Sequence, residues 1–191
     1  MKTYRGDYAQ EIAFPLSGIG TGGVSISGTG RLIDWELTGK ADKGNCNEYS
    51  HFAVKAERNG RVLDARVLHG DLTVGLNGSA LGSHHHSWGY GQGPNRTTLS
   101  GLAHFPQVAF TGEFPFASLD YVCEKMPAEL SLRAYNPFIP GDADNSSLPA
   151  AFFDWKIKNT SAEKTDYTLA FSVGNPFRIS EGGFASYEKI S

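Results

Sequence analysis

An alternation of apolar and polar residues with a period of two constrains this chain more than any other feature. One such run covers residues 51–57. Its apolar residues Phe52, Val54 and Ala56 fall on one face of an extended chain, as in a half-buried strand. The dipeptide Asn59-Gly60 follows and indicates a hairpin turn, because both residues tolerate positive φ.

The same alternation recurs along most of the chain. Further strands are predicted over residues 62–68, 71–76, 106–111, 116–122, 129–135, 150–158 and 167–173. We find no convincing amphipathic helix. Short strands separated by turns predict an all-β chain folded as an antiparallel β-sandwich. We expect one domain with two facing sheets and no helix longer than about two turns.

Composition supports a globular domain and argues against several classes of protein. Hydrophobic residues make up 40% of the 191 residues, and 23 glycines suit many tight turns. The formal net charge is -3, without a basic stripe, so nucleic acid is not an expected partner. With no secretory signal and no long apolar run, we expect no membrane span and a cytoplasmic location.

Three glycines, Gly18, Gly20 and Gly23, match the pattern G-x-G-x-x-G of dinucleotide-binding loops. Such a loop follows a buried strand and opens a helix. Here residues 24–27 alternate and include β-branched side chains, so the required helix is missing. We therefore expect a glycine turn leading into a β-hairpin, and no bound nucleotide or other cofactor.

The two cysteines, Cys46 and Cys123, leave two options open. They are too few for a disulfide framework and lack the spacing of a zinc site. Two free thiols in a reducing compartment are the simpler interpretation. One disulfide between them remains an alternative, because the sequence does not test its geometry.

The segment 79–100 has no strand period and is long for a loop inside a compact domain, which is typical of a functional or disordered loop. It contains Trp88 and Tyr90, whose rings could pack on the C–H faces of a sugar or simply against the sandwich. We treat both rings, with His84 and His86, as candidate substrate-binding residues.

A metal at these histidines is a weaker hypothesis. His84 and His86 would share one side of an extended chain, but a third ligand such as His104 would have to come from elsewhere. No metal is expected. The strand patterns place His51 and His69 on an ordinary surface or in the core.

Four stretches of sequence carry a more specific signal. They are residues 14–36 (FPLSGIGTGGVSISGTGRLIDWE), 101–110 (GLAHFPQVAF), 112–121 (GEFPFASLDY) and 135–149 (YNPFIPGDADNSSLP). In their order and spacing they resemble the N-terminal domain of the non-lysosomal glucosylceramidases of bile-acid β-glucosidase type, glycoside hydrolase family 116. The stretches run over most of the chain.

The resemblance implies a two-domain enzyme that hydrolyses β-glucosides, including glucosylceramide, with retention at the anomeric carbon. Its N-terminal domain is a β-sandwich, and its C-terminal domain is an (α/α)6 helical barrel that holds the nucleophile and the acid/base. Residues 1–191 would then be most but not all of the N-terminal domain, with no catalytic residue of their own. The expected partner is the helical domain of the same polypeptide, beyond residue 191.

Two other functions remain open at this point. The chain could be a free-standing carbohydrate-binding module, with Trp88 and Tyr90 as its platform, or a structural interaction domain. An exposed apolar patch would favour packing between domains. A row of exposed coplanar rings would favour the binding module.

Asp142 and Asp144 form the obvious local carboxylate pair, and retaining glycosidases use two carboxylates about 5–5.5 Å apart. Both lie in a turn-like stretch, however, where aspartate side chains bond nearby backbone N–H groups. We therefore expect a capping role and no catalytic one. The stretch lacks the sixth-position glycine and twelfth-position glutamate of an EF-hand, so only a looser calcium site remains open.

Overall fold

The computed structural model describes residues 2–39, 41–47, 49–72, 99 and 101–176. Strands dominate this part of the chain, and its one α-helix has four residues, so the predicted all-β class is confirmed. The elements in order are β1 (Thr3–Arg5), the 3₁₀ turn η1 (Gly6–Ala9), β2 (Ala13–Leu16), β3 (Gly23–Ser27), β4 (Leu32–Glu36), β5 (His51–Arg58), β6 (Arg61–Val67), β7 (Gln107–Glu113), β8 (Phe116–Val122), β9 (Ala128–Tyr135), α1 (Ala143–Ser146), β10 (Phe152–Asn159) and β11 (Asp166–Ser172).

One layer of the sandwich is a five-stranded sheet in the order β1-β7-β8-β9-β10, and every neighbouring pair is antiparallel. Burial alternates along its strands as the period of two predicts. In β8, Ala117, Leu119 and Tyr121 are buried, whereas Ser118 and Asp120 are exposed. The buried face of this sheet is therefore one wall of the core.

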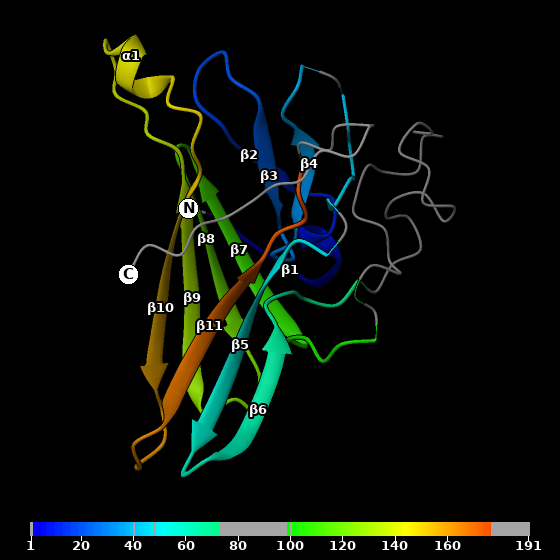
Figure 1. Ribbon diagram of the computed structural model, residues 1–191, viewed down its shortest axis with the longest axis vertical. Coiled ribbons are helices and arrows are strands. Elements are labelled where there is room, and N and C mark those ends of the chain that lie inside the picture. The colour runs from blue at the N-terminus through cyan, green and yellow to red at the C-terminus, as the bar shows by residue number, and fades with distance from the viewer. Residues whose placement is uncertain (1, 40, 48, 73–98, 100, 177–191) are drawn as a thin grey trace.

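The second layer consists of two three-stranded sheets, β2-β3-β4 and β11-β5-β6. Figure 1 shows β11, β5 and β6 crossing in front of the five-stranded sheet, with β2, β3 and β4 beyond their far end. Ile26 and Leu32 from the first sheet, and Phe52 and Val54 from the second, share one core with Leu119. The expectation of two facing sheets thus holds for the layers, but the second layer consists of two separate sheets and not of one.

The glycine motif lies between two strands, as expected for a hairpin. β2 pairs antiparallel with β3, and β3 with β4. A strand does precede the motif, which the sequence did not indicate, but β3 follows it in place of the helix that a dinucleotide loop needs. Gly20 has a φ of +71°, a left-handed conformation that suits glycine in a turn.

The structure also bears on the expected strand 71–76, on the two cysteines and on membrane-spanning helices. Asp71 and Leu72 lie outside any strand, and the rest of the expected strand 71–76 lies outside the described residues. Cys46 is buried and Cys123 is half-buried, and the two do not form a disulfide. In the part of the chain that the structure describes, no helix is long and apolar enough to cross a membrane.

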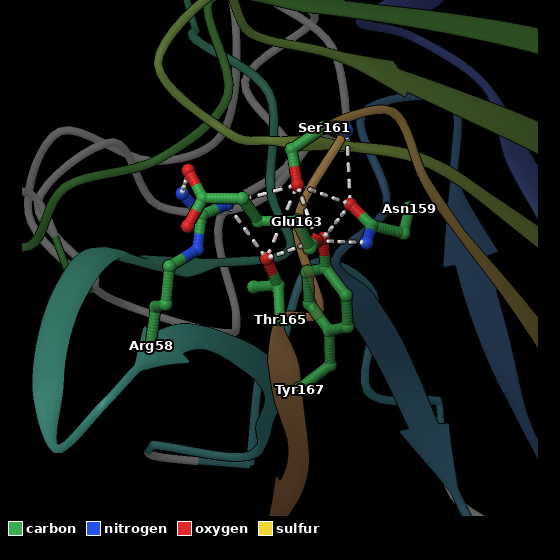
Figure 2. Close-up of polar contacts among 6 residues, drawn as sticks. All are labelled: Arg58, Asn159, Ser161, Glu163, Thr165 and Tyr167. Atoms are coloured by element: carbon green, nitrogen blue, oxygen red, sulfur yellow. Dashed lines mark hydrogen bonds and ion pairs between the residues drawn. The ribbon is translucent and has the colours of Figure 1, made fainter.

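Consecutive strands β10 and β11 belong to different layers, and a polar cluster holds the crossing between them (Figure 2). Arg58 at the end of β5 donates hydrogen bonds to Ser161 Oγ at 2.9 Å and to Thr165 Oγ1 at 3.0 Å. Its guanidinium also pairs with Glu163 at 2.9 Å. The crossing segment is therefore tied to the end of the neighbouring strand.

The same cluster reaches the five-stranded sheet through Tyr167 and Asn159. The Tyr167 hydroxyl lies 2.6 Å from the carbonyl oxygen of Pro127 and 3.1 Å from Asn159 Oδ1. Pro127 precedes β9, so this contact joins the two layers at one end of the sandwich.

Candidate functional site

Three separate connections meet at the other end of the sandwich (Figure 1). Large apolar side chains are exposed on all three of them. Ile19 belongs to the β2–β3 turn and Phe114 to the β7–β8 turn, while the other three residues belong to the β9–β10 connection that contains α1. Each of the five exposes between 40% and 60% of its surface. We name Ile19, Phe114, Phe138, Ile139 and Leu148 the tip patch.

Contacts within the tip make these residues one surface. The Ile19 N–H donates to the carbonyl oxygen of Ser146 at 2.9 Å. The Ser146 hydroxyl, fully buried, accepts from the Ile139 N–H at 2.9 Å and donates to the Ile139 carbonyl at 3.1 Å. The rings of Phe114 and Phe138 meet edge to face with centroids 5.0 Å apart. Hydrogen bonds and one contact between aromatic rings therefore join the three connections into a single surface.

Gly18 allows the β2–β3 turn to touch the β9–β10 connection. A Cβ at this position would lie 2.4 Å from the carbonyl oxygen of Leu148 and 2.7 Å from the carbonyl carbon of Ser147. Backbone atoms at such distances leave no room for a side chain. This glycine of the G-x-G-x-x-G pattern therefore serves close packing of two chain segments.

Asp142 caps the short helix in the same connection. Its carboxylate accepts hydrogen bonds from the Asn145 side-chain amide at 2.5 Å and from the Asn145 N–H at 3.0 Å. These bonds hold the pKa of the Asp142 carboxyl below its usual value. A general acid needs the opposite shift, so the cap predicted from turn chemistry is found and an acid at Asp142 is not supported.

A row of rings crosses the outer face of the five-stranded sheet, but it is no flat platform. Phe116, Tyr135 and Phe152 are direct cross-strand neighbours. The rings of Tyr135 and Phe152 stack with an interplanar angle of 15°, but the planes of Phe116 and Tyr135 are tilted by 57°. The Arg133 guanidinium carbon lies 3.8 Å from the centre of the Phe116 ring. Arg133 therefore covers the Phe116 ring, and the plane of that ring is not parallel to the plane of Tyr135. For these two reasons the row does not favour a sugar-binding module.

The comparison with known families covers most of the chain. Residues 13–188 match the family described as beta-glucosidase 2, glycosyl-hydrolase family 116 N-term. The chain belongs to this family. The resemblance stated from four stretches is thereby confirmed, and three of them, residues 14–36, 112–121 and 135–149, supply the side chains of the tip patch.

The site residues predicted from this family 116 sequence belong to another segment of the chain. His84, His86, Trp88 and Tyr90 all fall in residues 73–98, outside the described residues. The structure does describe both sides of that segment. Gly70 forms a parallel bridge with Phe105, and His104 Nε2 contacts the Asp71 carboxylate. The two ends of the long segment are therefore held together at one place.

A cavity of about 540 Å³ lies at this place, and Arg66, Asp71, His104, Gln107, Glu124 and Lys125 are among its lining residues. Arg66 is already engaged, since it donates to the His104 carbonyl at 2.7 Å and to Asp64 at 2.6 Å. No aromatic residue is among those described around the cavity, so the ring that a pyranose site commonly offers is missing from this part of it.

His69 lies buried, in line with the core position that its strand pattern allowed. Neither ring nitrogen has a hydrogen-bond partner, and the ring centre is 6.2 Å from that of His51. Burial, followed by the charges of Arg31, His51 and His104, holds the pKa of His69 well below its ordinary value. The imidazole is therefore neutral. Within the described ranges, no group of three or more His, Cys, Asp or Glu could hold a metal.

Sequence reasoning missed the tip patch as a site. It treated the stretch around Asp142 as turn chemistry and the glycine motif as a hairpin signal, and did not connect them. A signal was present, because Phe138, Ile139 and Leu148 are large apolar residues inside a proline-rich turn, where no strand face buries them.

Proposed function

We propose that this chain is the non-catalytic N-terminal sandwich of a retaining, glucosylceramidase-like β-glucosidase. It packs on the C-terminal helical catalytic domain of the same polypeptide through the tip patch. The observation that carries this proposal is the tip patch itself, five half-exposed apolar side chains brought together from three connections. Contiguous apolar surface of this kind marks interaction sites in soluble proteins.

The chemistry of the tip patch suits a helical partner. The N–H groups of Ile19 and Ile139 are bonded within the tip, so the surface offers side chains and not a free strand edge. Helices pack on such surfaces through side chains on their faces. The proposed contact therefore needs no strand from the partner.

The proposal assigns the chemistry to the helical domain. The family resemblance implies a nucleophile and an acid/base in that domain, and the hydrogen-bonded Asp142 supports a structural role for the local carboxylates. A β-glucoside or glycolipid is the substrate of the whole enzyme, without a cofactor. The lack of a disulfide between Cys46 and Cys123 supports a reducing, cytoplasmic location as part of the proposal.

The test places lysine in the tip patch of the complete polypeptide. Ile139→Lys combined with Leu148→Lys should lower kcat/KM on an aryl β-glucoside by about tenfold or more, because buried interface positions are each worth about 1–2 kcal/mol. Val62→Lys is the matched control, since Val62 is an equally exposed apolar residue on the far edge strand β6. Both variants should leave the melting temperature of the isolated chain nearly unchanged.

Two results would contradict the proposal. Unchanged activity and stability of the complete enzyme with both tip lysines would show that the patch does not contact the catalytic domain. Turnover of the aryl β-glucoside by the isolated chain, lost in Asp142→Ala or Asp144→Ala, would show that the sandwich itself is catalytic.

A further inference from the structure

The turn between β5 and β6 is a two-residue loop with the sequence Asn59-Gly60. Arg58 at the end of β5 pairs with Arg61 at the start of β6, so only these two residues connect the strands. Their φ angles are +50° and +75°, which suits a tight hairpin turn. Both residues are exposed, and a Cβ added to Gly60 would have no described residue within 4 Å except its neighbours in the chain. The loop is therefore open to water.

Asn59 differs from the other asparagines that the structure describes. Its side-chain amide makes no hydrogen bond to any described residue. Hydrogen bonds hold the side chains of four others, Asn45, Asn47, Asn145 and Asn159. Asn136 and Asn175 precede prolines, which carry no backbone N–H. Within the described ranges, only Asn59 combines a side chain without hydrogen bonds and a following N–H group.

These two features are what an intramolecular reaction of asparagine requires. The Gly60 nitrogen attacks the side-chain carbonyl carbon of Asn59, and a five-membered cyclic imide forms as the bond from that carbon to the amide nitrogen breaks. The amide nitrogen leaves as ammonia together with the Gly60 N–H proton. Glycine favours the attack because it has no Cβ beside the nitrogen. Water then opens the imide at either carbonyl, which gives aspartate or isoaspartate.

We propose that Asn59 is a site of spontaneous deamidation in the folded chain, and that its product loosens the crossing from β10 to β11. The reaction uses two neighbouring residues and one water molecule, without an oxidant or a cofactor. It therefore does not depend on a partner or on another domain. Isoaspartate adds one methylene to the backbone of the two-residue loop, so it should break the pairing of Arg58 with Arg61.

The crossing is affected because Arg58 belongs to both structures. Its guanidinium donates hydrogen bonds to Ser161 and Thr165 and also forms an ion pair within the crossing segment. Figure 1 shows the β5–β6 turn at the same end of the sandwich as this crossing. Deamidation places a new carboxylate on the residue that directly follows Arg58 in the chain. Carboxylates bind guanidinium groups strongly, so the new one should compete with Ser161 and Thr165 for Arg58.

The test is peptide mapping by mass spectrometry after the folded 191-residue chain has been incubated in a mildly alkaline buffer. The peptide with Asn59 should gain about one dalton, the difference between an amide and a carboxyl group. This should happen at least about tenfold faster than at Asn145 and Asn159, where hydrogen bonds must break first and the next residue has a side chain. An isoaspartate methyltransferase detects the isoaspartate. The pair Asn77-Gly78, outside the described residues, is measured in a separate peptide.

Two variants separate the site from its consequence. Asn59→Gln should stay unmodified, because its longer side chain would have to close a larger ring. Asn59→Asp carries the new charge but keeps the backbone length, so it reports the effect of the charge alone. After the incubation the unaltered chain should melt about 2–4 °C lower than before, whereas Asn59→Gln should keep its melting temperature. Asn59→Asp should fall between the two.

Three results would contradict the proposal. Modification of Asn59 in urea but not in the folded chain would overturn the site, because it would show that the fold protects the loop. Equal rates at Asn59, Asn145 and Asn159 would overturn it as well. If the modified chain keeps its melting temperature and its amide hydrogen exchange at Ser161 and Thr165, the product leaves the crossing intact and the second part of the proposal is rejected.

Discussion

At the scale of single residues, His69 is strongly affected by its surroundings. It is buried without a hydrogen-bond partner at either ring nitrogen, and Arg31, His51 and His104 all act against its protonation. A buried imidazole in this situation favours its neutral form, so the folded state resists taking up a proton that the unfolded chain accepts. This difference links stability to pH.

The sign of that linkage follows from the lowered pKa. Above the ordinary value of 6.5 both states are neutral, and the contribution of His69 is constant. Below it only the unfolded chain binds the proton, so the free energy of unfolding should fall by up to about 1.4 kcal/mol per pH unit. His69→Leu should remove this part of the slope between pH 7 and pH 5 in urea titrations. His51→Gln is the control, and an unchanged slope in His69→Leu would show that His69 is not responsible.

At the scale of elements, the crossing from β10 to β11 depends on Arg58. This side chain donates to Ser161 and Thr165 and pairs with Glu163, whereas Glu163 is mostly exposed (Figure 2). Because hydrogen bonds of a charged donor to partly buried groups are worth more than an exposed ion pair, the two partners should not contribute equally.

We expect Arg58→Met to lower the free energy of unfolding by about 1.5–3 kcal/mol, since it leaves two hydroxyls without their charged donor. Glu163→Gln should cost less than about 1 kcal/mol, because it weakens only a screened surface pair. Urea denaturation of both variants measures the difference. Equal losses would mean that the ion pair, and not the hydroxyl network, holds the crossing.

At the scale of the whole molecule, the segment 73–98 joins two points that the fold already holds together. The Gly70–Phe105 bridge and the contact between Asp71 and His104 are made by residues outside that segment. The sandwich therefore does not need the length of the segment in order to close.

Replacing residues 82–93 with a short glycine linker should consequently leave the isolated chain folded, with a melting temperature within a few degrees of the original. In the complete enzyme the same deletion removes Trp88, Tyr90, His84 and His86, and should raise KM or lower kcat on a β-glucoside. Unchanged activity and substrate preference would show that these four residues have no role in substrate binding.

Much of this molecule was predictable because its signals are local. The alternation around Phe52 and Val54 predicted β5 and its buried face, and the absence of a helical pattern after Gly23 excluded a nucleotide loop. The turn chemistry around Asp142 predicted a cap. Each of these inferences depends on residues within a few positions of one another, where backbone preferences and side-chain period act directly.

The amino-acid sequence by itself determined most of the strands, the all-β class and, through four recognisable stretches, the family. Only the tertiary structure decided which residues meet: that Gly18 touches Leu148, and that the rings of Phe114 and Phe138 meet edge to face. The reason is physical. A strand is specified by neighbours along the chain, whereas a surface is assembled from segments far apart in sequence, and their meeting depends on sheet order and on the packing of the core.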